Sequence, residues 1–236
     1  MSHFHRMVTN RRTTLGFGAL ALLSTLSACS TRPPLPEAGG WHGVRLPGKA
    51  PTRYQRAFHE GRWAVEAVAD RSVSLWRQRL DLPPDRLGEV SFSWWAPAVV
   101  KGASVTDPGR DDAVARVVFG FDGDRSRLSA RVRAQFELAQ LLTGEEPPYA
   151  TLMYVYDSEA AVDTLVTSAR SERIRKWVLD SGSEGLGRWR DHRRDIAADF
   201  ETAFGEAPGP LRSVAFMTDG DNTQQQVQAW YGAVSV

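Results

Sequence analysis

Two short phrases of the chain place carboxylates at the ends of predicted strands. Asp111 and Asp112 open one run of alternating side chains, and Asp219, Asp221 and Asn222 stand at a predicted turn near the C-terminus. Such oxygen atoms, gathered at one rim, would bind sugar hydroxyls or a cation, or would supply an acid and a base to a glycosidic bond. The alternative is structural, because Asp and Asn are favoured in turns where their side chains bond the local backbone.

One aromatic and one basic side chain complete this candidate site. Alternation in the run 89–95 places Trp94 toward a core and Trp95 on the outward face. An outward indole can stack on a sugar ring, although most tryptophans of β-sandwiches are core residues, and Trp95 could also pack beneath a helix. Arg116, four residues beyond Asp112, is a candidate ion-pair partner for the aspartates. The candidate ligand-binding residues are Trp95, Asp111, Asp112, Arg116, Asp219, Asp221 and Asn222.

Familiar catalytic and cofactor motifs do not fit the chain. The segment 182–189 has the glycine spacing of a P-loop, but Arg188 and Trp189 stand where Lys and Ser or Thr must contact phosphate and magnesium. An EF-hand over 219–230 fails because Gln224 replaces the required Gly. Neither a zinc-ligand spacing nor a nucleophile elbow is present. We therefore expect no cofactor and favour a protein without catalytic activity, while a cation at the carboxylates stays an open alternative.

The elements that must position these residues are mostly strands. The chain has 236 residues, of which 42% are hydrophobic and 24% charged, and this composition excludes disorder, collagen and coiled coil. A net charge of +1 without a long basic run excludes an electrostatic nucleic-acid site. Side chains alternate with period two in the segments 61–69, 73–80, 89–95, 113–121, 149–156, 173–179, 211–219 and 229–236. Helical spacing occurs only in 128–142 and 196–204.

This pattern predicts a mostly β fold, a two-sheet jelly-roll-like β-sandwich with two short helices. The first two runs are expected to pair as a hairpin across the turn Asp70-Arg71-Ser72. No repeat and no second linker interrupts the chain beyond residue 52. We therefore predict one β-sandwich domain over residues 52–236.

The N-terminal 28 residues are typical of an export signal. Three arginines precede an uncharged run whose apolar centre, 15–26, is shorter than the roughly 20 residues that a bilayer span needs. The run ends at Leu26-Ser27-Ala28-Cys29, which resembles the lipobox of bacterial lipoproteins. In that chemistry the Cys29 thiol receives a diacylglycerol, the signal is cut before it, and the new amino group is acylated. Cys29 is the single cysteine of the chain, so an internal disulfide does not compete with lipidation.

The expected location is the cell envelope, with a lipid anchor and no transmembrane helix. Ser30 resembles a residue that permits transfer to the outer membrane, so the periplasmic face of that membrane is predicted. The segment 29–51 is rich in Pro and Gly and is expected to be a flexible tether. Arg11-Arg12 also resembles a twin-arginine signal, which leaves the export route open. Loss of the three arginines of 1–28 would take the formal net charge from +1 to −2.

Several phrases together resemble the exported bacterial proteins grouped as domain of unknown function 3047. They are 48–54, Trp94-Trp95, the Asp-Asp-x-x-x-Arg phrase 111–116, Asp199-Phe200 with Phe204-Gly205, 217–223 and Trp230-Tyr231-Gly232. The resemblance covers residues 41–236 and implies a β-sandwich of carbohydrate-binding-module type without a catalytic assignment. This chain departs from the family pattern at Asp70-Arg71-Ser72, where the family tends to place small residues.

Three functions follow as hypotheses. The first is a non-catalytic binding module that recognises an envelope glycan or another envelope component through Trp95 and the aspartate-rich rim. The second is a carboxylate-based glycan-cleaving enzyme, which needs two carboxyl groups about 5 to 10 Å apart in a groove. The third is a structural or assembly lipoprotein that binds another envelope protein through an exposed apolar patch.

Overall fold

A computed structural model describes residues 40–236 of the chain. The predicted signal, Cys29 and Ser30 lie outside these residues. Within them the strands are β1 (Trp41–Arg45), β2 (Arg53–His59), β3 (Arg62–Asp70), β4 (Ser74–Leu82), β5 (Glu89–Trp95), β6 (Ala115–Phe121), β7 (Ala150–Asp157), β8 (Leu165–Thr167), β9 (Ile174–Ser181), β10 (Arg190–Asp195), β11 (Leu211–Met217) and β12 (Gln226–Tyr231). The described part contains two α-helices, α1 (Ala130–Thr143) and α2 (Ile196–Phe204), and neither is long and apolar enough to cross a membrane.

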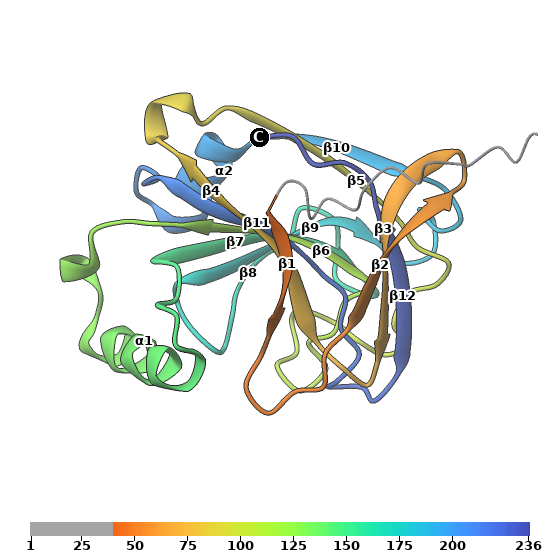
Figure 1. The fold of residues 1–236 in the computed structure, drawn as a ribbon, viewed down its shortest axis with the longest axis horizontal. Helices are drawn as coiled ribbons and strands as arrows, with labels where there is room; N and C mark the ends of the chain where they lie inside the picture. The colour runs from red at the N-terminus through yellow and green to blue at the C-terminus, as the bar shows by residue number, and fades with distance from the viewer. Residues whose placement is uncertain (1–39) are drawn as a thin grey trace, which may run out of the picture. The chain divides into compact units, whose positions relative to one another are not determined.

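The strands form two sheets that pack face to face (Figure 1). One sheet has seven strands in the order β1-β4-β11-β6-β7-β9-β8, and the other has five in the order β10-β5-β12-β3-β2. Neighbours are antiparallel except for β7 and β9, which run parallel. The prediction of a mostly β, two-sheet jelly-roll-like sandwich with two helices is confirmed.

The core lies between the inner faces of the two sheets. Phe92 of the five-stranded sheet stacks on Tyr154 of the seven-stranded sheet, with ring centroids 5.4 Å apart. Trp94 is fully buried, as its place in the alternation predicted, and its indole Nε1 donates to Asp180 at 2.7 Å. Strand β6 is the fourth of the seven strands, and every one of its residues is buried, so both faces of this central strand are covered.

The helices begin and end where the sequence places their capping residues. Ser129 caps α1 by accepting a hydrogen bond from the Val132 amide, and Asp195 caps α2 in the same way. Gly144 and Gly205 end the two helices at φ values of 73° and 69°, a left-handed backbone that glycine adopts without strain. The predicted helical ranges are therefore correct to within two residues.

Three sequence expectations are wrong. Strands β3 and β4 do not form a hairpin, because β3 pairs with β2 and β12 while β4 pairs with β1 and β11, so the chain crosses between sheets at residues 71–73. The folded domain begins before residue 52, since β1 lies within the predicted tether and pairs with β4. The last strand ends at Tyr231 rather than continuing to Val236. Gly232, the residue after this strand, lies so close to Ser93 that a Cβ added to the glycine would be 2.1 Å from the Ser93 hydroxyl oxygen.

Candidate functional site

The two aspartate phrases converge at one end of the seven-stranded sheet. Met217, at the end of β11, is the register partner of Arg116, near the start of β6. The segments before β6 and after β11 therefore leave the sheet side by side, and this is why residues a hundred positions apart meet. Carboxylate oxygens of Asp112, Asp219 and Asp221 lie within 4.8 Å of one another.

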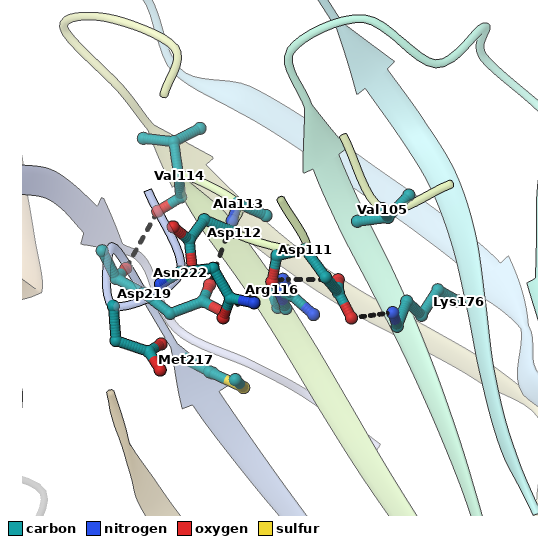
Figure 2. A network of polar contacts seen from close by, with 12 residues as sticks. Val105, Asp111, Asp112, Ala113, Val114, Arg116, Lys176, Met217, Asp219 and Asn222 are labelled. Carbon is teal, nitrogen blue, oxygen red and sulfur yellow. Dashed lines mark hydrogen bonds and ion pairs between the residues drawn. The ribbon is translucent and has the colours of Figure 1, made fainter. Parts of the chain in front are cut away.

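Arg116 lies at the centre of this cluster with a side chain that is 2% exposed. Its Nη2 donates to the backbone oxygen of Asp111 at 2.9 Å, to the Asp111 carboxylate at 3.2 Å and to the Asp219 carboxylate at 3.0 Å. Lys176 of β9 donates to the second oxygen of Asp111, as Figure 2 shows. The expected pairing of Arg116 with the aspartates is present, and Lys176 joins it as a residue that the sequence did not single out.

Asp112 ties the loop before β6 to the turn after β11. Its carboxylate accepts a hydrogen bond from the backbone N–H of Asn222 at 3.1 Å. It also accepts from the backbone N–H and the side-chain hydroxyl of Thr223, at 2.6 and 2.7 Å. Asp219 likewise accepts from the amide of Ala113 at 3.0 Å. These bonds hold two loops together, which is the structural alternative foreseen for Asp residues in turns.

The cluster contains its own counter-ions. Lys49 donates to Asp221 at 2.5 Å, so the ammonium of Lys49, the guanidinium of Arg116 and the ammonium of Lys176 face the four aspartates of the cluster. A metal ion held by Asp112, Asp219 and Asp221 would have to displace Lys49. The carboxylates are held in bonds to Arg116, Lys49, Lys176 and backbone amides, so the protein itself occupies the oxygens that an acid and a base would present to a substrate.

Burial sets the ionisation of the cluster. It raises the pKa of Asp219 to about 7, since the pull of Arg116 in the other direction is partly cancelled by Asp112 and Asp111. Burial, with the neighbouring charge of Arg116, also lowers the pKa of Lys176. For Arg116 burial acts against the charge, but Asp219 and Asp111 outweigh it and keep the pKa above its ordinary value.

A groove of about 290 Å³ begins beside this cluster on the outer face of the seven-stranded sheet. Its floor follows one row of register partners, in which Ala215 pairs with Val118, Val118 with Met153 and Met153 with Lys176. Met217 extends the floor toward the cluster. Asp111, Arg116, Asp219 and Asp221 form the charged end of the groove.

The opposite end of the groove is closed by other elements. Phe136 of α1 and the pair Pro147-Pro148 form its wall. Gly120 allows Pro148 to approach the sheet, because an added Cβ would lie 3.0 Å from Pro148 and 2.6 Å from the Ser213 hydroxyl. We name this feature, lined by Val118, Met153, Ala215 and Met217, the outer groove.

The family of this chain follows from a match over nearly all of the described residues. The family model for Protein of unknown function (DUF3047) matches residues 39–235. The chain belongs to this family. No curated protein matches the chain.

Solved structures similar to this DUF3047 domain are distant in sequence. A family 11 carbohydrate-binding module of a cellulosomal cellulase from Clostridium thermocellum has 9% identity and a TM-score of 0.39, over 83% of this chain and 85% of that one. The xyloglucanase domain of the effector NopAA from Sinorhizobium fredii has 11% identity and a TM-score of 0.43, over 83% and 91%. A thermostable cellulase derived from Cel12A of Rhodothermus marinus has 12% identity and a TM-score of 0.40, over 84% and 95%.

Trp95 lies apart from the aspartates, on the outer face of the five-stranded sheet of the DUF3047 domain. Its ring meets His59 at 4.3 Å and Trp230 at 5.0 Å between centroids, both edge to face, and His59 stacks on Trp230 at 3.9 Å. The outward direction of Trp95 was predicted, but the residues that cover it are His59 and Trp230 rather than α1. Trp95 lies on the outer face of one sheet and the aspartates border the groove on the outer face of the other, so they do not form one site.

Proposed function

We propose that this DUF3047 domain is a non-catalytic binding module of the cell envelope that holds an elongated, mainly apolar ligand in the outer groove. The observation that carries the proposal is the apolar floor of that groove. The outer face of an antiparallel sheet is usually polar because water covers it. Here Val118, Met153, Ala215 and Met217 lie on the outer face instead, where Leu46, Val73 and Leu75 pack with them and a groove stays open beside them.

The chemistry of the groove favours an apolar envelope component over a bare glycan. Sugar sites combine a flat aromatic face with free polar groups, whereas the floor of the outer groove consists of aliphatic and thioether side chains. Its polar end is occupied by the ion pairs of Arg116 and Lys176 with Asp111 and Asp219. A glycan site built jointly from Trp95 and the aspartate-rich rim has no support from the positions of these residues.

Membrane attachment through Cys29 is part of the proposal. Lipidated Cys29 would hold the domain at the periplasmic face of the outer membrane, where acyl chains and other apolar envelope components are available to the groove. The supporting observations are the lipobox-like phrase and the single cysteine. Intact-mass measurement of the mature protein is expected to show a chain that begins at Cys29 and carries acyl groups. An unmodified Cys29 would remove the anchor.

An assembly lipoprotein is the second candidate, favoured by the surface of α1. Leu138, Leu141 and Leu142 are 58%, 83% and 62% exposed. An exposed apolar patch of this kind is typical of a surface that another protein covers. The two candidates use different residues, so substitutions in the groove and on α1 separate them.

Met153→Gln tests the outer groove. It replaces a thioether of the floor by an amide of similar length, and burying an amide without a partner disfavours an apolar ligand by about 1–3 kcal/mol. We expect the apolar fluorophore N-phenyl-1-naphthylamine to bind the wild-type protein and to bind the variant at least fivefold more weakly, as measured by fluorescence titration.

Val162→Gln is the matched control, because Val162 is 52% exposed and lies outside the groove lining. This variant should bind the fluorophore like the wild type. Equal binding by Met153→Gln and the wild type, or no binding by the wild type, would contradict a ligand in the outer groove.

A further inference from the structure

Two hollows meet at Trp63, at the beginning of β3. The first has a volume of about 280 Å³ and is lined by Trp41, Arg56 and Trp63. The second, of about 660 Å³, is lined by Arg62, Ser91, Asp191 and Arg193, and again by Trp63. Gly232 and Ala233 also border both hollows. The indole therefore stands between an aromatic hollow and a polar one.

Trp63 is exposed although its place in the strand faces the core. Val65, Ala67 and Ala69 share its face of β3 and are all buried, whereas Trp63 is 44% exposed. Phe58, its register partner on β2, is 62% exposed. Trp63 borders a hollow whose other side is lined by Trp41 and Phe216 of the seven-stranded sheet, so the space between the sheets is not filled at this end. Leaving two large rings in water is unfavourable, which points to a ligand at this end of the sandwich.

Neighbouring side chains fix the orientation of the indole before any ligand arrives. The guanidinium of Arg56 lies over one face of the Trp63 ring, 4.5 Å from its centroid, so a sugar ring would stack on the other face. The Phe58 ring meets Trp63 edge to face, with centroids 5.3 Å apart and an interplanar angle of 70°. A ring held in this way loses little conformational entropy when a flat partner stacks on it.

The second hollow supplies polar groups that can bond several hydroxyls at once. Arg62 donates to both oxygens of Asp191, at 2.5 and 3.1 Å, and the two side chains are 42% and 63% exposed. This planar pair keeps free donors on the guanidinium and free lone pairs on the carboxylate. Ser91 adds a hydroxyl on the same side. Arg62 and Trp63 are consecutive in β3 and point to opposite sides of the strand, but both line the second hollow. An indole and a planar set of donors and acceptors that share one hollow match a glycan chain, whose sugar rings have apolar C–H faces and a polar rim.

We propose that Trp63 and the Arg62–Asp191 pair form a saccharide-binding subsite, with the indole stacked on one sugar ring of a glycan chain and the pair bonded to hydroxyls of the same chain. This subsite lies at the end of the five-stranded sheet and is separate from the outer groove of the seven-stranded sheet. Its ligand class is a neutral glycan chain, whereas the groove takes an apolar ligand.

Affinity electrophoresis and fluorescence titration of the full chain with cellohexaose, maltohexaose and chitohexaose test the subsite. We expect at least one of these oligosaccharides to bind at millimolar concentration or below. Trp63→Ala should weaken that binding at least tenfold, and Trp63→Phe should weaken it less because it keeps a flat ring. Arg62→Met should weaken it at least threefold, through the lost hydrogen bonds.

Two controls keep the outcome interpretable. Leu141→Ala changes a side chain that is 83% exposed on α1 and should leave sugar binding unchanged. Met153→Gln should also leave it unchanged, while Trp63→Ala should leave fluorophore binding in the outer groove unchanged, so the two sites succeed or fail separately. A lack of binding by all three oligosaccharides, or equal binding by wild type and Trp63→Ala, would overturn the subsite.

Discussion

Replacement of Arg116 by methionine is expected to lower the free energy of unfolding by about 3–5 kcal/mol, because it removes the central cation of a buried ion-pair network. Asp111 and Asp219 would each lose a charged hydrogen bond, and Asp219 would keep only its bond from the Ala113 amide. Methionine fills a similar volume, so the loss reports the unpaired carboxylates rather than a cavity. Urea unfolding followed by tryptophan fluorescence measures the difference.

Arg212→Met is the matched control for this prediction. Arg212 pairs with Asp81 and Asp122, but its side chain is 45% exposed and those of its partners are 83% and 37% exposed. Exposed pairs contribute little, so a change of about 0–1 kcal/mol is expected. If Arg116→Met unfolded within 1 kcal/mol of wild type, the network would not stabilise the domain. A chain that does not fold at all would agree with the prediction.

The regular elements could be predicted because local side-chain patterns determine them. Trp94 is buried and Trp95 faces outward, as the alternation in 89–95 requires. The helix caps at Ser129 and Asp195 were available as short-range signals. The meeting of the aspartate phrases was also expected, since strand ends of a sandwich gather at shared rims.

Strand pairing could not be predicted, because it depends on contacts between remote segments. The run 61–69 and the run 73–80 are separated by a short turn that suits a hairpin, yet they enter different sheets. The backbone of Arg71 has a φ of 49°, and Ser72 is buried with its hydroxyl accepting the Asp70 amide. These features turn the chain from one sheet to the other, and only the departure of Asp70-Arg71-Ser72 from the family pattern hinted at them.

The groove and Lys176 were missed for a related reason. Val118, Met153 and Ala215 each lie on the outward face of their own strand, and no single strand shows that these positions form one row. Lys176 lies in a predicted strand, between Arg175 and Trp177, and its burial follows only from the pairing of that strand with β7 and β8. The signal that could have indicated a groove is an apolar residue at the outward position of each of several neighbouring strands.

The cluster links the stability of the domain to the shape of the groove. Asp111 and Asp219 line the groove and are held by Arg116, while Asp112 fixes the turn that carries Asp221. A rigid charged end limits how far an apolar ligand can extend along the floor. In the proposed binding module, these buried acids would fix the shape of the groove through their bonds within the protein.

The stability of the domain is expected to fall as pH rises from 5 to 8, through Asp219. Burial raises the pKa of Asp219 to about 7 in the folded protein, above the roughly 3.9 of an aspartate in an unfolded chain. At pH 5 the folded protein therefore keeps a proton that the unfolded chain has released. The proton on Asp219 therefore stabilises the folded protein relative to the unfolded chain. This stabilisation is fully present below about pH 4 and is lost as pH rises through the folded pKa near 7.

Asp219→Asn isolates this effect, because asparagine mimics the neutral acid and can still accept the Ala113 amide hydrogen bond at its Oδ1. Urea unfolding of both proteins at pH 5 and pH 8 gives two stability differences, in which all other titrating groups are shared. We expect the difference to shift in favour of the variant by about 2–3 kcal/mol between these pH values, since two pKa units correspond to about 2.7 kcal/mol. A difference that is the same at pH 5 and pH 8 would mean that Asp219 is ionised throughout, with Arg116 fully compensating its burial. A shift in favour of the variant therefore shows that the cluster of four aspartates and three cations binds an additional proton below neutral pH.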